Sequence, residues 1–325
     1  MPNKNIFEPS LANYNLAVKY LRQGKLVSFP TETVYGLGAD ATNDKAVASI
    51  FEAKKRPSFN PLIIHLPDLA QVEEYADLDI VSRKLAERFW PGPFTLVLNK
   101  KANSPLSKLV TAGLDTVAIR VPEHDVARTL LEKYGGPIAA PSANISGKLS
   151  PTTAAHVAEA FGDNIAMILD GGPCRNGIES TIVHVCGSEI RLLRPGSITK
   201  KEIEEVSGLR VSLYEEAQNP TAPGQLKSHY APNSPIRLNA SEVYPSEALL
   251  AFGSNIPRLH GNISLNLSPK GSLHEAAANL FSMLHQLDDM KVAGIAVSPI
   301  PAHGLGRAIN DRLQRAAAPS EDQNS

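Results

Sequence analysis

Hydrophobic positions in residues 1–210 alternate between short apolar runs, which predict strands, and stretches with helical spacing. Strands are predicted at 25–29, 61–66, 94–98, 116–121, 137–140, 166–169, 181–185 and 190–193. Helices are predicted at 13–21, 45–55, 79–89, 124–134, 152–161 and 199–206. Because the two kinds of element interleave and several strands are short, this pattern predicts an α/β domain with an open, twisted mixed sheet.

The alternation stops at residues 211–234, where Pro, Gly, Asn and Ser dominate and no apolar period holds. This composition predicts a linker. A second alternation follows over residues 235–325, with strands predicted at 235–238, 248–254 and 294–300, and helices at 273–289 and 304–317. Its order and spacing predict a smaller α/β domain with a Rossmann-like parallel sheet.

Composition narrows the class of protein. The chain has 325 residues and a formal net charge of −1, so any RNA contact has to come from a local patch rather than a global basic field. Its two cysteines, Cys174 and Cys186, form no CxxC pair, which favours a reducing compartment over a disulfide scaffold. The first residues are polar and no run approaches the length of a membrane span, so we expect a cytoplasmic protein without membrane contact.

Candidate chemistry is concentrated in residues 28–65. An apolar strand ends at Pro30, and the hydroxyl- and glycine-rich stretch TETVYGLGAD, expected to be a turn, leads into a helix that runs into Lys54, Lys55 and Arg56. Backbone and hydroxyl donors beside fixed positive charge bind polyphosphates. The stretch therefore predicts an anion site. We expect the helix-end cations to be exposed, so that replacing them leaves the fold intact.

Further polar residues lie at predicted strand ends. Ser142 and Asn144 come directly off a buried strand, where sites in open α/β sheets gather, whereas Ser146 is better explained by turn chemistry. On the strand 116–121, alternation places Thr116 and Arg120 on one face. No acid is adjacent to Arg120 in sequence, and a buried arginine is costly unless an anion pairs with it.

Other features have simpler interpretations. The nine histidines show no HxxxH or HExxH spacing, so no protein metal site is expected. Cys174 lies beside two glycines with no activating partner in sequence, and a small loop residue is a better interpretation than a nucleophile. The GLGR stretch at 304–307 is weak evidence for a phosphate site. Tyr230, within the linker stretch SHYAP, is either a surface residue that docks on a domain or part of a lid.

Four motifs together resemble one family. They are FPTETVYGLG, the KxR motif at Lys54–Arg56, PGPFTLVL and the SxN motif at Ser142–Asn144. In combination they closely resemble the YrdC-like family of threonylcarbamoyl-AMP synthases. SHYAP and the C-terminal α/β module are similar to the long form of that family. The resemblance implies a YrdC-like catalytic domain at 1–210, a lid-forming linker at 211–234 and a C-terminal domain at 235–325.

The family resemblance implies a nucleotidyltransferase that joins L-threonine, bicarbonate and ATP, with Mg²⁺ on the ATP phosphates, into threonylcarbamoyl-AMP and pyrophosphate. It also implies that the product passes to a tRNA threonylcarbamoyl transferase complex for modification of tRNA position 37, with no more than a weak tRNA contact. Lys54 and Arg56 would be catalytic, stabilising the transferring phosphate. The implied ATP contacts are Lys54, Arg56, Asn60, Thr116, Ser142, Asn144, Ser150, Arg194 and Tyr230.

The implied threonine contacts are Thr33, His65, Arg120, Ala140, and Ser180 or Thr181. Arg120 is the candidate for pairing with the threonine carboxylate in a bidentate manner. His65 has an alternative interpretation as a strand histidine with satisfied hydrogen bonds, and the sequence leaves Ser180 and Thr181 undecided.

Two other classes of protein fit the sequence less well. An RNA-binding module would bind RNA in a salt-sensitive manner without ATP turnover, but the neutral charge and compact polar clusters favour a small-molecule site. A carbamoyl-adenylate activity, as in the YrdC-like domain of hydrogenase-maturation proteins, would come with zinc-finger-like and acylphosphatase-like regions. This chain has neither the cysteines nor the length for them.

Overall fold

The computed structural model describes residues 5–213, 221–225, 228–258 and 262–319. The chain divides into two compact units. The first unit comprises Met1–Ser146, Pro151–Cys174 and Glu179–Gln225, and the second comprises Gly147–Ser150, Arg175–Ile178 and Leu226–Ser325. Two short segments within the predicted catalytic domain, 147–150 and 175–178, therefore belong to the second unit.

The first unit is built on a mixed sheet. Its described strands are β1 (Ile6–Phe7), β2 (Val27–Phe29), β3 (Gly36–Asp40), β4 (Ile63–His65), β5 (Phe94–Asn99), β6 (Thr116–Arg120), β7 (Ile138–Ala139), β8 (Met167–Leu169), β9 (Thr181–Cys186), β10 (Glu189–Arg194) and β11 (Arg210–Leu213). They lie in the order β1-β8-β2-β3-β7-β4-β6-β5-β9-β10-β11. β4 runs parallel to β6 and antiparallel to β7, so the predicted mixed sheet is confirmed.

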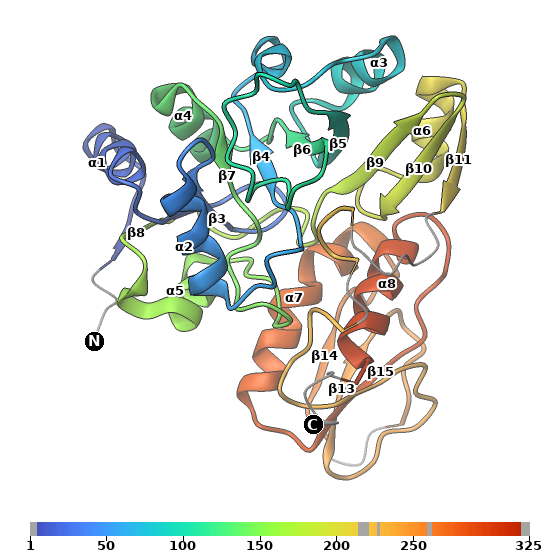
Figure 1. Ribbon diagram of the computed structural model, residues 1–325. Coiled ribbons are helices and arrows are strands. Elements are labelled where there is room, and N and C mark those ends of the chain that lie inside the picture. The colour runs from blue at the N-terminus through green and yellow to red at the C-terminus, as the bar shows by residue number, and fades with distance from the viewer. Residues whose placement is uncertain (1–4, 214–220, 226–227, 259–261, 320–325) are drawn as a thin grey trace. The chain divides into compact units, whose positions relative to one another are not determined.

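Helices cover this sheet unevenly. They are α1 (Leu11–Arg22), α2 (Asp44–Lys54), α3 (Ile80–Phe89), α4 (Asp125–Tyr134), α5 (Ala154–Phe161) and α6 (Lys200–Ser207), with short 3-10 turns η1 (Ala70–Glu74) and η2 (Gly162–Asn164). The core formed with α2, α3, α5 and α6 contains Ile64 of β4 and Ile119 of β6. The helices α1 and α4 lie side by side (Figure 1) and pack on β2, β7 and β8 through a separate core.

Strand alternation leaves part of the sheet without helical cover. Ile63, Val97 and Ala118 point away from the large core and form a small apolar cluster with Ile182, Leu193 and Ala222. No member of this cluster comes from a described helix. His65 and Arg120 follow Ile63 and Ala118 at a spacing of two, so they share this face. Two of the predicted threonine contacts, His65 and Arg120, therefore lie on the face that carries the small apolar cluster.

Two segments differ from the sequence prediction. The expected turn after Pro30 contains β3, which runs antiparallel to β2; a Cβ on Gly38 would lie 2.8 Å from the Phe29 ring, so glycine here permits close packing of strands rather than a turn. The predicted linker begins with β11, which pairs in parallel with β10 and buries Val211. This strand was not predicted because it is short and lies among polar residues, so its apolar pattern is weak.

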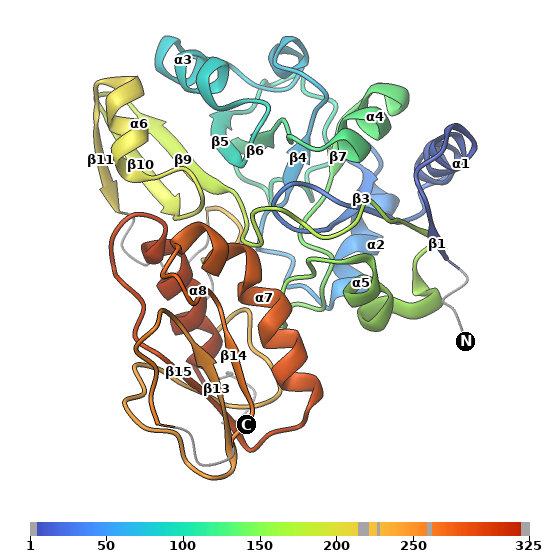
Figure 2. The same ribbon diagram turned by 180° about the vertical axis from the view of Figure 1, so that it is seen from behind.

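The second unit contains an all-parallel sheet in its described part, as predicted. Its strands are β12 (Ile236–Arg237), β13 (Glu247–Ala251), β14 (Ser264–Asn266) and β15 (Gly294–Val297), in the order β12-β15-β13-β14. The helices α7 (Leu273–Asp289) and α8 (Gly306–Ala317) lie beside this sheet (Figure 2). The polar strand β14 was not predicted. Of the linker, residues 214–220 and 226–227 lie outside the described residues.

Candidate functional site

The KxR motif at the end of α2 contacts the SxN motif directly. Only 1% of Lys54 is exposed, and its Nζ atom donates hydrogen bonds to the main-chain oxygens of Ser142 (2.6 Å) and Asn144 (2.5 Å). Burial, and then the charge of Arg56, hold the pKa of Lys54 well below its usual range. The expectation that the helix-end cations are exposed holds for Lys55 but is wrong for Lys54 and Arg56. The end of α2 packs against the 142–144 loop, where main-chain oxygens replace water around the Lys54 ammonium group.

Arg56 and Asn60 lie in the turn after α2. Arg56 is buried and donates from Nε to the main-chain oxygen of Asn60 (3.2 Å) and from Nη2 to that of Pro61 (2.9 Å). Asn60 is fully buried, and among the described residues neither polar atom of its side chain has a hydrogen-bond partner. A buried amide without partners is unfavourable in the protein alone. Asn60 therefore has polar atoms available for a ligand.

Arg120 pairs with an acid that the sequence analysis did not identify. Its Nη2 atom lies 2.7 Å from Oε1 of the buried Glu32, while Nη1 donates to Thr33 Oγ1 (2.8 Å) and Nε donates to the main-chain oxygen of Gly92 (3.2 Å). The sequence indicated that a buried arginine here needs an anion, and the turn between β2 and β3 supplies one by bringing Glu32 to the end of β6. The structure does place Arg120 and Thr33 together; their contact with threonine stays a prediction.

His65 ends β4 and is paired in register with Arg120 on β6. Its ring is buried and lies edge-on to Phe29, with ring centroids 6.3 Å apart. Burial, and then the charge of Arg120, lower the pKa of His65 to about 3. The ring is therefore neutral at physiological pH, and a neutral imidazole carries one donor and one acceptor. Among the described residues, Nδ1 of this buried ring has no hydrogen-bond partner, so the interpretation as a strand histidine with satisfied hydrogen bonds is wrong for this atom. The contact of His65 with threonine stays a prediction.

Ser180 and Thr181 have different hydrogen-bond partners. Arg194 donates from Nε to the main-chain oxygen of Ser180 and from Nη2 to its Oγ, both at 3.0 Å, and Ser180 Oγ lies 2.7 Å from Thr95 Oγ1. The Thr181 hydroxyl instead donates to the main-chain oxygen of Ile198 (2.8 Å) and accepts from its N–H (3.0 Å). Ser180 thus belongs to the polar cluster with Arg194, whereas the Thr181 hydroxyl fixes the turn after β10.

The other predicted contacts are divided between the two units. Thr116 begins β6 in the first unit, and Ala140 follows β7 there, with its N–H donating to the main-chain oxygen of Ile63 (2.9 Å). Ser150 and Tyr230 belong to the second unit. His285 Nε2 lies 3.3 Å from the main-chain oxygen of Ser150.

Tyr230 is buried in the second unit. Its ring centroid lies 5.5 Å from that of Phe281 and 5.3 Å from the Arg312 guanidinium. Its φ of 63° is in the left-handed region, which non-glycine residues rarely adopt. The position of Tyr230 within this unit agrees with the interpretation of a tyrosine that docks on a domain. Its role in a lid stays a prediction.

Two functional candidates were missed from the sequence. Glu32 and Thr95 are both buried polar residues within the site cluster. One sequence feature could have identified both residues. Each is a polar residue within or shortly after an apolar strand. Cys174, by contrast, is buried and burial raises the pKa of its thiol, which agrees with its interpretation as a structural residue.

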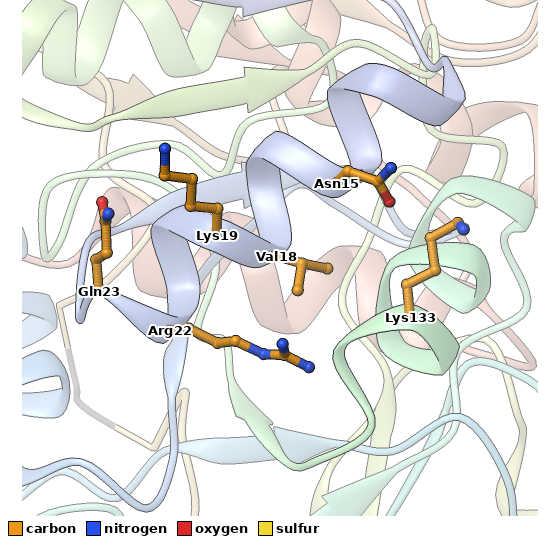
Figure 3. A pocket seen from close by; sticks show the side chains of 6 residues that line it. All are labelled: Asn15, Val18, Lys19, Arg22, Gln23 and Lys133. Atoms are coloured by element: carbon orange, nitrogen blue, oxygen red, sulfur yellow. The ribbon is translucent and has the colours of Figure 1, made fainter.

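A surface pocket outside this cluster lies on the α1 and α4 side of the first unit. It has a volume of about 540 Å³ and is lined by Asn15, Val18, Lys19, Arg22, Gln23 and Lys133 (Figure 3). It contains none of the residues predicted to bind ATP or threonine.

Comparisons with known proteins identify the family. A family model for Sua5, YciO and YrdC, described as "Telomere recombination", matches residues 19–196. A second, described as the C-terminal domain of threonylcarbamoyl-AMP synthase, matches residues 198–318. The chain belongs to the Sua5/YciO/YrdC family. The resemblance identified from the motifs is thereby confirmed.

Individual relatives match nearly the whole chain. The threonylcarbamoyl-AMP synthase of Bacillus subtilis is 42% identical, over 95% of this chain and 93% of its own. The crystal structure of P. abyssi Sua5 complexed with L-threonine has a TM-score of 0.87 and 38% identity, and covers 96% of this chain and 97% of that one. E. coli YciO, with a TM-score of 0.55 and 21% identity over 61% of this chain and 98% of its own, shares the fold of the first unit.

The described part of the chain also lacks two kinds of feature. None of its helices combines the length and apolar character needed to cross a membrane. No group of three or more His, Cys, Asp or Glu residues within it is arranged to hold a metal ion.

Proposed function

We propose that this protein is a nucleotidyltransferase that makes threonylcarbamoyl-AMP and pyrophosphate from L-threonine, bicarbonate and ATP. The observation that carries the proposal is the contact of Lys54 with Ser142 and Asn144, which joins the KxR and SxN motifs in one site. The identity with named synthases over nearly the whole chain supports it. The product would supply the threonylcarbamoyl group for tRNA position 37 through a separate transferase complex.

The reaction has two steps. The threonine ammonium and bicarbonate give a carbamate, R–NH₃⁺ + HCO₃⁻ → R–NH–COO⁻ + H₂O + H⁺. A carbamate oxygen then attacks the α-phosphorus of ATP, forming the new P–O bond while the bond to pyrophosphate breaks. Because the carbamate is labile, the site has to hold it close to the phosphorus and away from water.

Lys54 and Arg56 would stabilise the charge on the phosphates during this transfer. The Lys54 ammonium has three donors, of which two bind main-chain oxygens, so one remains for a phosphate oxygen. Burial disfavours the charged lysine, and a bound polyphosphate would favour it again. The further ATP contacts in the first unit would be Asn60, Thr116, Ser142, Asn144 and Arg194.

Magnesium would enter with the nucleotide in this proposal. Its ligands would include phosphate oxygens of ATP and water. The ion would neutralise charge on the leaving pyrophosphate.

The threonine site would lie on the sheet face that carries His65 and Arg120, next to Thr33 in the turn between β2 and β3. The small apolar cluster on the same face, which includes Ala118, would accommodate the threonine methyl group. Ser180 is favoured over Thr181 as the hydroxyl contact, because Ser180 belongs to the polar cluster with Arg194 and Thr95, whereas the Thr181 hydroxyl binds Ile198 in the turn after β10.

The deciding experiment measures pyrophosphate release with L-threonine and bicarbonate each omitted in turn. Mass spectrometry of the nucleotide product identifies the adenylate. We expect release only when both are present, with threonylcarbamoyl-AMP as the product. Release that is indifferent to threonine would refute the proposed function.

A further inference from the structure

The buried carboxylate of Glu32 contacts Arg120 but makes no hydrogen bond within the described residues. Only 1% of Glu32 is exposed, and its Oε1 atom lies 2.7 Å from Arg120 Nη2. Among the described residues, however, neither carboxylate oxygen of Glu32 has a hydrogen-bond partner. The contact is an ion pair without the alignment of a hydrogen bond. A buried carboxylate normally accepts hydrogen bonds, because burial removes those it makes to water.

The neighbouring groups are already held in place. Arg120 donates from Nη1 to Thr33 and from Nε to Gly92. Thr33 Oγ1 also lies 2.8 Å from Thr31 Oγ1, which donates to the main chain of Val34. The guanidinium is therefore fixed without Glu32. A structural role in positioning Arg120 does not explain why both Glu32 oxygens lack hydrogen bonds.

Side by side, Glu32 and Arg120 present one negative and one positive group. A free α-amino acid carries the complementary pair, an ammonium and a carboxylate on one carbon atom. Arg120 is the predicted partner of the threonine carboxylate. An ammonium group has three donors and would supply the hydrogen bonds that the Glu32 oxygens lack.

We propose that Glu32 binds the α-ammonium group of threonine. This inference rests on the proposed function and deepens it, because it assigns the amine end of the substrate to a named side chain. The nitrogen atom of this group becomes the nitrogen of the carbamate, so Glu32 would fix the position of the reacting atom. It would also select amino acids over hydroxy acids and simple carboxylic acids of similar shape.

The test compares L-threonine with 3-hydroxybutanoate, which has the same carbon skeleton, carboxylate and hydroxyl but no ammonium group. Binding of each to the full-length protein is measured by calorimetry. A hydrogen bond between charged groups typically changes affinity by roughly 10- to 100-fold. We expect the wild-type protein to bind L-threonine tighter than 3-hydroxybutanoate by a factor in this range. Equal affinities would overturn the inference without any variant.

Glu32→Gln then separates ammonium binding from a structural role. We expect L-threonine affinity to fall by a similar factor, with 3-hydroxybutanoate affinity changed less than about threefold. Loss of both affinities by the same factor would show that Glu32 only positions Arg120 and would overturn the inference, as would no loss of either. Glu52→Gln, at an exposed position on α2, is the matched control and should bind both ligands as the wild type does.

The two proposals fail in different ways. If wild-type pyrophosphate release depends on threonine but Glu32→Gln binds both ligands as the wild type does, the proposed function stands and the role of Glu32 is overturned. If wild-type release does not depend on threonine, the proposed function itself is overturned, and the inference with it.

Discussion

Lys54 Nζ lies 2.6 Å from the main-chain oxygen of Ser142, 88 positions later in the chain. The same ammonium also binds the main-chain oxygen of Asn144, and the N–H of Ser146 donates back to the main-chain oxygen of Lys54. The end of α2 and the loop after β7 are thereby joined by three hydrogen bonds. Lys54 thus supports the site, and in the proposed function its ammonium group would also bind a phosphate.

Replacing Lys54 should therefore affect activity and stability together. For Lys54→Met, which keeps most of the apolar stem, we expect turnover to fall by about 10²-fold or more, because charge stabilisation of the phosphate is lost. We also expect a loss of about 1–3 kcal/mol in the free energy of unfolding, because the main-chain oxygens of Ser142 and Asn144, at partly and fully buried hydrogen bonds, lose their donor. Pyrophosphate release and urea unfolding measure the two effects.

Lys55→Met is the matched control for this change. Lys55 is the next residue but is exposed, so we expect activity and unfolding to stay close to wild type. If Lys54→Met and Lys55→Met had equal, small effects on turnover, the phosphate role of Lys54 would be wrong.

Ser180 and Thr181 should differ when each loses its hydroxyl. We expect Ser180→Ala to lower kcat/KM for threonine by roughly 10- to 100-fold. The variant lacks the hydroxyl group that would contact threonine from the polar cluster with Arg194 and Thr95. Thr181→Val should instead cost about 1–3 kcal/mol of unfolding free energy, since the partly buried N–H and oxygen of Ile198 lose their partner. Its KM for threonine should remain within about threefold of wild type. The reverse pattern would assign threonine binding to Thr181.

The low pKa of His65 predicts a pH dependence of stability. The folded protein keeps His65 neutral down to about pH 3, whereas in the unfolded chain the ring binds a proton below about pH 6.5. Unfolding is therefore favoured as pH falls through this window, by up to about 1.4 kcal/mol per pH unit for one proton. Above pH 6.5 the ring is neutral in both states and contributes no slope.

Urea unfolding between pH 7 and pH 4.5 checks the His65 prediction. We expect the stability of His65→Gln to fall less steeply than that of the wild type, by about 3 kcal/mol in total at pH 4.5. His274→Gln, at an exposed position on α7, should follow the wild-type slope. Equal slopes for all three proteins would mean that His65 is protonated in the folded state as readily as in the unfolded chain.

The lid proposal for Tyr230 is tested in the full-length chain. If Tyr230 shields the carbamate and the mixed anhydride from water, Tyr230→Ala should lower the yield of threonylcarbamoyl-AMP per ATP consumed. Because Tyr230 is buried against Phe281, the variant should also lose about 3–5 kcal/mol of unfolding free energy. The measurement is the ratio of intact adenylate to AMP at a temperature where the variant is folded.

Tyr244→Ala is the control for the lid, since Tyr244 is an exposed tyrosine of the same unit. It should leave the ratio of adenylate to AMP unchanged. An unchanged ratio in Tyr230→Ala as well would show that this tyrosine serves only to pack the second unit.

The sequence by itself determined the fold class and most of the candidate site. Apolar periodicity identified elements such as β5, β6 and α7 because each has an apolar face long enough to show its period. Motif residues such as Lys54 and Ser142 were identified because the chemistry of a polyphosphate site restricts which residues can bind it.

Only the tertiary structure decided the partners of these residues. Glu32 and Arg120 are 88 positions apart, and no local pattern reports that a turn and a strand end will meet. The exposure of Lys54 was wrongly expected for the same reason, because burial of a helix end depends on which loop packs against it. The strands β3 and β11 were not predicted from the sequence. β3 is interrupted by glycines and β11 is short and polar, so neither shows a clear alternation of apolar and polar residues. Local physics thus fixed which elements form and which chemistry is available, and long-range packing fixed which charges are buried, paired and left for a ligand.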